Sequence, residues 1–230
     1  MIVLTKRVDV QGQESMKLSV IASAAGDLVW PRLVLKGIRD VSKKHFSSLE
    51  PGIKTGSFRF SFTESGFVNK DVFCKIILDL DEYLTVNHTP RPIFLLIDGA
   101  TCHISLQARD LAKDREIMLW LLYPNSTHIL QPLDLGLFGP VKNVFRRLVW
   151  DWHGNIANMN KSLTKYTSVP LIVQSLDTVL TRKGKNGIIT GFLRSGVFPW
   201  NPEAVCFSTL KPSSKFQTDL SSKDVEVSTK

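Results

Sequence analysis

The chain has 230 residues, of which 43% are hydrophobic and 22% charged, so it can bury one sizeable core and we expect one principal domain. Its formal net charge of +8 favours a polyanionic partner. The cysteines Cys74, Cys102 and Cys206 form no C-x-x-C pair, which argues against a zinc site or a disulfide framework. No apolar run is long enough to span a membrane, and the apolar start at Met1 is too short for a signal peptide, so we expect no membrane partner.

The N-terminal half of the chain alternates between strand and helix patterns. The turn residues Gly26 and Asp27 separate two β-rich runs. Asn69 is suited to cap the helical pattern that follows it. In chain order we expect a hairpin of strands over 17–25 and 28–35, an extended segment over 51–66, a helix over 69–84 and an apolar strand over 92–98.

The C-terminal half is mostly helical in pattern. Pro140 stands at the start of a basic amphipathic stretch in which Val141, Phe145 and Trp152 share one face. We expect helices over 106–113, from Pro140 onward and over 168–181, a buried strand over 117–122 and a disordered tail over 205–230. This order of elements predicts an α/β domain of three layers with a mixed sheet.

Two aspartates stand where a metal site is plausible. Asp98 ends an apolar strand, and Asp134 comes just before the basic helix. A carboxylate at a strand end and a second one at a helix approach suit a divalent cation. Other readings stay open, because Asp98 also suits an Asx turn and Asp134 also suits a helix cap. His103 and His128 are candidates to contact the metal or orient the carboxylates, although a lone histidine is more often structural.

The basic stretch after Asp134 has two interpretations. Lys142, Arg146 and Arg147 are either a solvated helix face or a set of phosphate contacts beside the acidic site. We expect the tryptophans Trp150, Trp152 and Trp200 to pack on the domain rather than to stack on bases.

Three blocks of the sequence resemble one known family. Segments 96–103, 122–136 and 191–202 occur in the order found in the DDE-type transposase domain of pogo, Tigger and jerky-like elements. The resemblance implies a ribonuclease-H-like three-layer domain in which three acidic residues hold two Mg²⁺ or Mn²⁺ ions for DNA cleavage. Asp98 matches the second acid and Asp134 the third. The resemblance also implies DNA as the partner and the nucleus as the location.

The first acid of that family has no clear counterpart. In the family it lies on an opening strand, whereas segment 17–26 resembles the strand after it. Asp9 and Glu14 lie in a polar connector and Asp27 in a turn, so none is a good replacement. We therefore expect an N-terminally truncated domain whose opening strand is missing. The expected organisation is a connector over 1–16, the DDE domain over 17–204 and the tail over 205–230.

Three functional hypotheses follow. The first is DNA binding by a transposase-derived domain that is catalytically incomplete as given. The second is an active metal-dependent endonuclease whose first acid is supplied by a missing upstream segment. The third is a domesticated protein-interaction module that has kept the fold.

Overall fold

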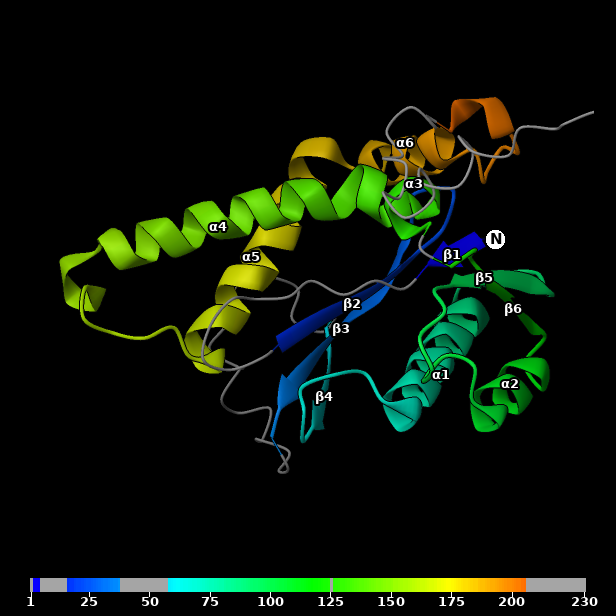
Figure 1. The fold of residues 1–230 in the computed structure, drawn as a ribbon, viewed down its shortest axis with the longest axis horizontal. Coiled ribbons are helices and arrows are strands. Elements are labelled where there is room, and N and C mark those ends of the chain that lie inside the picture. Colours follow the sequence, from blue (N-terminus) through cyan, green and yellow to red (C-terminus); the bar gives the residue numbers. More distant parts are fainter. Residues whose placement is uncertain (1, 5–15, 38–57, 125, 206–230) are drawn as a thin grey trace, which may run out of the picture.

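The computed structural model describes residues 2–4, 16–37, 58–124 and 126–205. Strands form a central layer with helices on both sides (Figure 1). On one side lie α1 (Lys70–Val86) and α2 (Leu106–Lys113). On the other side lie α4 (Gly139–Gly154), α5 (Lys165–Lys183) and α6 (Asn186–Ser195), with the short α3 (Thr127–Leu130) near the start of α4. The expected three-layer α/β architecture with a mixed sheet is confirmed.

The strands form two hydrogen-bonded groups. The first has the order β2–β3–β4, from Met16–Ala22, Leu28–Lys36 and Arg59–Thr63, with β2 and β3 antiparallel and β3 and β4 parallel. The second has the order β1–β5–β6, from Ile2–Leu4, Ile93–Ile97 and Ile117–Leu121, all parallel. Because β1 also contacts β2, the two groups meet at these strands.

The expectation of a missing opening strand is wrong. Ile2–Leu4 forms β1, which pairs in parallel with β5 and lies between β5 and β2. The sequence pattern predicts a connector over 1–16, because a run of three apolar residues is too short to indicate a strand by itself. The backbone pairing with β5 stabilises this short segment as a strand. The expected positions of Asp9 and Glu14 and the tail over 206–230 lie outside the described residues.

The expected hairpin, the helices and the strand that ends at Asp98 are present within a few residues of their predicted limits. Of the extended segment expected over 51–66, only 58–66 lies within the described residues, and it contains β4. Gly26 adopts a φ of +85° in the turn between β2 and β3, a conformation that glycine adopts without steric cost. Asn69 caps α1 by accepting a hydrogen bond from the backbone nitrogen of Val72 at 2.9 Å. The hairpin and the helix after it therefore follow from local sequence signals.

The predicted burial of the strand over 117–122 is wrong in part. Ile117 is buried, but Met118 and Trp120 are 48% and 59% exposed. β6 is the outer strand of its group, so one of its edges has no neighbouring strand among the described residues. Ile117 and Leu119 pack in the core beneath α1 and α2, whereas Met118 and Trp120, at the alternate positions, lie on the opposite, exposed face of this outer strand.

Two cores lie on opposite faces of the strands. All seven residues of β2 are buried, and Leu18 and Val20 pack in the core beneath α4, α5 and α6. Ile21, with the opposite orientation, packs in the core beneath α1 and α2. The polar residues of this strand, Lys17 and Ser19, are buried as well.

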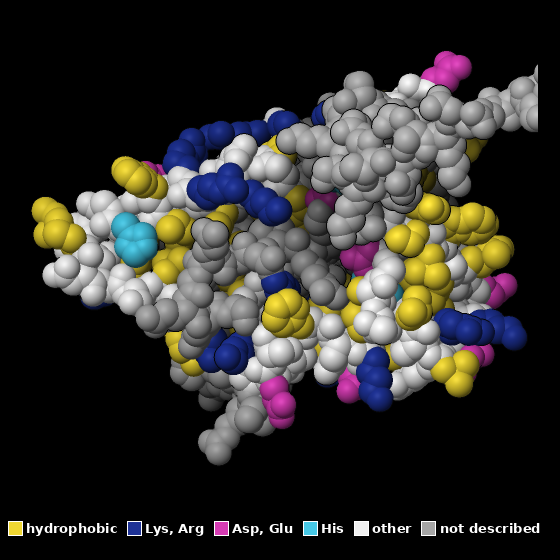
Figure 2. All heavy atoms as spheres, viewed as in Figure 1, with side chains coloured by type: hydrophobic (Ala, Val, Ile, Leu, Met, Phe, Trp, Pro, Cys, Tyr) yellow, Lys and Arg dark blue, Asp and Glu magenta, His cyan; other side chains and the backbone are white. Residues whose placement is uncertain are grey.

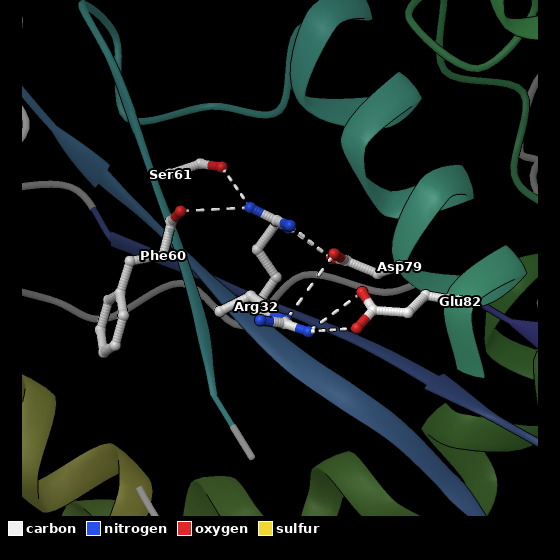
Figure 3. Close-up of polar contacts among 6 residues, drawn as sticks. Arg32, Phe60, Ser61, Asp79 and Glu82 are labelled. Atoms are coloured by element: carbon white, nitrogen blue, oxygen red, sulfur yellow. Dashed lines mark hydrogen bonds and ion pairs between the residues drawn. The ribbon is translucent and has the colours of Figure 1, made fainter. Parts of the chain in front are cut away.

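A buried ion pair joins α1 to β3 and β4 (Figure 3). Arg32 donates from Nε to Asp79 Oδ2 at 3.0 Å, and its Nη2 makes a further contact with the same oxygen. Arg32 Nη1 donates to the Phe60 carbonyl at 3.1 Å and to Ser61 Oγ at 2.7 Å. The Arg32 and Asp79 side chains are only 8% and 12% exposed. Removal of one partner would therefore leave a buried charge without compensation.

We predict that Arg32→Met lowers the free energy of unfolding by about 3–5 kcal/mol, the usual cost of leaving one member of a buried pair alone. Arg59→Met is the matched control, because the Arg59 side chain is 35% exposed and its contact with Asp79 is 3.8 Å. The control should cost about 1 kcal/mol or less. Urea denaturation of both variants is the measurement, and equal losses would contradict the assigned role of Arg32.

Candidate metal and nucleic-acid site

Asp98 lies directly after β5, at the end of a buried parallel strand. Its Oδ1 accepts a hydrogen bond from the backbone nitrogen of Ala100 at 3.2 Å, which is the Asx turn that its local sequence also suggested. The side chain is 28% exposed, so the carboxylate reaches the protein surface at the strand end. A turn role and a ligand role are compatible in this geometry.

His103 is a charged partner of Asp98. Its Nδ1 lies 2.6 Å from Asp98 Oδ1, and the imidazole is buried against the ring of Phe73 from α1, with ring centroids 4.3 Å apart. Burial lowers the pKa of His103, but hydrogen bonds to Asp98 and Cys102 outweigh burial and raise the pKa to about 9. At neutral pH the ring is therefore protonated, and Nδ1–H donates to the carboxylate and orients it.

Asp134 begins a π-helical turn, Asp134–Phe138, that continues directly into α4. Its backbone nitrogen donates to the carbonyl of Gln131 at 3.0 Å. The side chain is half-buried, and its Oδ2 atom is buried and accepts no hydrogen bond from the described residues, although Asp134 has a further interaction. A π-helical turn inside a helix is often found at functional sites.

The two aspartates border the same core. Leu96, which precedes Asp98 by two positions, and Leu133, next to Asp134, both pack in the core beneath α4, α5 and α6. The strand end and the start of the π-helical turn therefore belong to one packed region. That the two carboxylates share one cation stays a prediction.

The π-helical turn packs backbone to backbone against α6. A Cβ atom added to Gly136 would lie 2.1 Å from the carbonyl oxygen of Gly187, and one added to Gly191 would lie 2.1 Å from that of Pro132. Real Cβ atoms do not approach so closely, so only glycine fits at these two positions. This contact determines where the segment around Asp134 lies relative to α6.

Polar contacts hold α6 at both ends. At its N-terminus the Lys185 ammonium pairs with the carboxylate of Asp27 in the β2–β3 turn. Asp27 also accepts a hydrogen bond from Ser23 Oγ at 3.2 Å. Near its C-terminus Arg194 Nη1 donates to the carbonyl of Leu135, in the π-helical turn, at 3.2 Å. Asp27 is therefore engaged by Lys185 and Ser23 within the β2–β3 turn, as expected for a turn residue.

The predicted basic residues all lie on α4. Arg146 and Arg147 are exposed and Lys142 is half-buried, while Val141 and Phe145 pack in the core on the opposite side. Figure 2 shows lysine and arginine side chains along the part of the surface where α4 runs. The amphipathic pattern is thus confirmed, and the cations face solvent.

Other predicted residues lie elsewhere. His128 is exposed on α3, and none of the contacts within the described ranges joins it to Asp98 or Asp134. The expectation that the tryptophans pack is wrong for two of them, because Trp150 and Trp200 are each 79% exposed. Trp152 packs against the core as expected. Trp152 lies on the face of α4 that meets the core and Trp150 does not, so position on the helix, rather than residue type, decides which of these two side chains packs.

The donor set suits a single hard cation. Carboxylate oxygens are the ligands that Mg²⁺ and Mn²⁺ prefer, and Mg²⁺ is often held by one or two carboxylates with waters completing its coordination. Asp98 and Asp134 fit that pattern. Within residues 16–37, 58–124 and 126–205, no cluster of three or more His, Cys, Asp or Glu side chains is arranged to hold a metal. A bound cation would supply charge stabilisation for a phosphoryl group.

The family of the chain follows from comparison with known proteins. The family described as DDE superfamily endonuclease matches residues 14–186, more than half of the chain, and the chain belongs to that family. In its fold the chain is similar to the catalytic domain of Mos1 transposase.

The likeness to Mos1 is structural. Against the domain solved with raltegravir and Mn, the TM-score is 0.53 at 15% identity, over 84% of this chain and 76% of that one. The same domain with Mg has a TM-score of 0.53 at 15% identity, over 84% and 77% of the two chains. The Mos1 strand transfer complex has a TM-score of 0.51 at 16% identity, over 86% of this chain and 51% of that one. At such identities the likeness shows a ribonuclease-H-like catalytic-core fold.

One curated relative is much longer than this chain. The chain is 24% identical over 200 residues to a protein of Cochliobolus lunatus named MFS-type transporter clz9, and the match spans 87% of this chain but 21% of the relative. No described helix of this chain has the length and apolar character needed to cross a membrane.

The sequence alone did not predict that α6 packs against the segment around Asp134 and holds it in place. A signal was present, because Gly187 and Gly191 stand four positions apart in a helix-forming segment. Glycine costs about 1 kcal/mol relative to alanine inside a helix, so two on one face indicate close backbone packing.

We predict that Gly191→Ala lowers the free energy of unfolding by about 1–3 kcal/mol, the usual cost of overpacking, because the added methyl group overlaps the Pro132 carbonyl. Gly139→Ala is the matched control, since its Cβ would meet no atom within 4 Å. The control should be neutral or stabilising by up to about 1 kcal/mol.

Denaturant titrations of both variants test this contact, and Gly187→Ala provides an intermediate case because its Cβ would lie 3.3 Å from the Gly136 carbonyl. A loss in Gly139→Ala as large as that in Gly191→Ala would contradict the assigned contact.

Proposed function

We propose that this chain binds DNA as a transposase-derived DDE domain and that it is catalytically incomplete as it stands. The observation that supports binding most directly is the set of cations on α4, the helix that continues from the turn bearing Asp134. Phosphate groups along this helix would be neutralised by Arg146 and Arg147, while Asp134 stands just before its start.

The closer assignment within the family is also a proposal. The three sequence blocks around Asp98, Asp134 and Gly191 favour the pogo, Tigger and jerky-like branch. Domains of that branch act on DNA, which supports the nucleus as the location of this chain. The net charge of +8 agrees with a polyanionic partner.

We propose that the set of catalytic carboxylates is incomplete because the first of the three acids has no clear counterpart in this chain. In the resembled family this acid lies on the opening strand, and here the strand beside β5 has the sequence Ile2-Val3-Leu4. Asp27 is held by Lys185 and Ser23 in its turn. Two-metal phosphoryl transfer needs a ligand set that holds both cations about 3.5–4 Å apart. Asp98 and Asp134 alone suffice for one weakly bound cation.

Two alternatives remain distinct from this proposal. In the first, an acid from a further segment completes the site and the protein is a metal-dependent endonuclease. In the second, the domain has become a protein-interaction module, which would fit the exposed apolar residues of β6 such as Trp120. The two experiments below separate these alternatives.

We predict that Arg146→Glu combined with Arg147→Glu weakens binding to all duplex sequences alike. Each phosphate contact releases counterions, so the slope of log affinity against log salt should fall in magnitude by about 2. Fluorescence anisotropy over a series of salt concentrations measures both effects. The matched control is Arg109→Glu with Lys113→Glu, which makes the same change of charge on α2, in the opposite helical layer. Equal weakening in the two double variants would place the DNA surface elsewhere.

We predict that the purified chain does not nick supercoiled DNA with Mg²⁺ or Mn²⁺. The physical reason is that two carboxylates cannot bracket both the attacking and leaving oxygens with two cations. Gel assays of the wild-type chain and of Asp98→Ala provide the measurement. Nicking by the wild type that disappears in Asp98→Ala would establish the endonuclease alternative instead.

A further inference from the structure

The outer face of α4 carries an aromatic side chain in line with its cations. Lys142, Arg146, Trp150 and His153 follow one another at intervals of four, four and three residues, which places them along one face of the helix. We call this set the α4 row. Its last three members are exposed, and Trp150 is 79% exposed. The row faces away from the core that buries Val141 and Phe145.

The exposed indole of Trp150 is unusual for this residue type. Tryptophan is buried to a high degree on average, and its large apolar surface makes solvent exposure costly. Trp152, two positions later, shows the ordinary arrangement, since it packs on the core and against the ring of His153 at a centroid distance of 4.8 Å. Trp150 therefore offers a free π-face at a position where the helix does not need it for packing.

Exposed apolar side chains lie at the C-terminal end of α4 and in the segment after it. Figure 1 shows the C-terminal end of α4 extending past β2 and β3, and Figure 2 shows hydrophobic and histidine side chains gathered at that end of the molecule. The apolar residues after the helix include Ile156, 85% exposed, and Met159, 65% exposed. Basic side chains thus lie along the helix and apolar surface lies at its far end. The acidic Asp151 lies on the neighbouring face, four positions after Arg147.

We propose that the α4 row binds unpaired nucleotides of a DNA strand, with Trp150 as a stacking platform for a base and Arg146 as the contact for a neighbouring phosphate. This inference rests on the proposed DNA binding and adds the class of substrate, single-stranded or unpaired DNA. A cationic groove with an aromatic ring is the usual composition of surfaces that bind single strands, because every base has a π-face. Charge complementarity with phosphate favours this ligand over a protein.

The distance between Trp150 and Asp134 follows from their positions in one helical segment. Trp150 lies 16 positions after Asp134 in one continuous helical segment. At about 1.5 Å per residue the separation is roughly 20–24 Å along the axis. At the duplex rise of about 3.4 Å per nucleotide this separation corresponds to roughly six or seven nucleotides, and an extended unpaired strand would span it with fewer.

The experiment compares the binding of a short oligo-dT strand and of a duplex of the same length. Trp150→Ala should weaken binding of the single strand about tenfold, the loss expected for one stacked base, and should change duplex affinity by less than about twofold. Trp150→Phe should recover most of the affinity, because it keeps an aromatic face. Trp200→Ala is the matched control, since Trp200 is equally exposed at 79% but lies in the turn after α6.

Other results would overturn the proposal. Equal single-strand affinity in Trp150→Ala and Trp200→Ala would exclude stacking on Trp150, whereas the salt dependence of duplex binding would still support the proposed function. Absence of binding to both DNA forms by the wild-type chain would overturn the two proposals together. Conversion of a wild-type dimer into a monomer by Trp150→Ala, measured by light scattering, would assign the row to a protein contact.

Discussion

The close backbone contact between the π-helical turn and α6 is the constraint on which the candidate site depends. Gly136 and Gly191 allow two main-chain segments to approach to a distance that any Cβ atom would prevent. Because the π-helical turn continues into α4, the same contact sets the position of Asp134 and the starting point of the helix that bears the cations. The pairing of Lys185 with Asp27 then ties α6 to the β2–β3 turn, so the central strands and the Asp134 segment are held through one helix.

Asp98 is held by a different set of interactions. Its position follows from parallel pairing of β5 with β1 on one side and β6 on the other. Its carboxylate is oriented by the backbone of Ala100 and by His103, whose raised pKa keeps it positively charged at neutral pH. Proteins often hold a metal-binding carboxylate by such outer contacts, which fix its orientation before a cation arrives. The buried pair of Arg32 and Asp79 lies apart from these residues and fastens α1 to β3 and β4.

The chain combines a family fold with an unusual opening strand. Membership of the DDE superfamily endonuclease family and likeness to the Mos1 catalytic domain agree with the parallel strands and the flanking helices. The described residues of the short strand beside β5, Ile2–Leu4, include no acid, and the proposal of an incomplete catalytic set rests on this. This difference separates the proposed binding function, which depends on the surface of α4, from catalysis, which depends on a complete set of carboxylates.

The sequence by itself determined the elements whose causes are local. The Gly26 turn, the Asn69 cap, the strand that ends at Asp98 and the amphipathic helix after Asp134 all followed from periodicity and capping chemistry. Only the tertiary structure decided that Ile2–Leu4 is a strand, because three residues become a strand through the neighbour that they pair with. It also decided that α6 holds the turn at Asp134 through the contact of Gly191 with Pro132. These features depend on contacts between segments distant in the chain, which local patterns do not record.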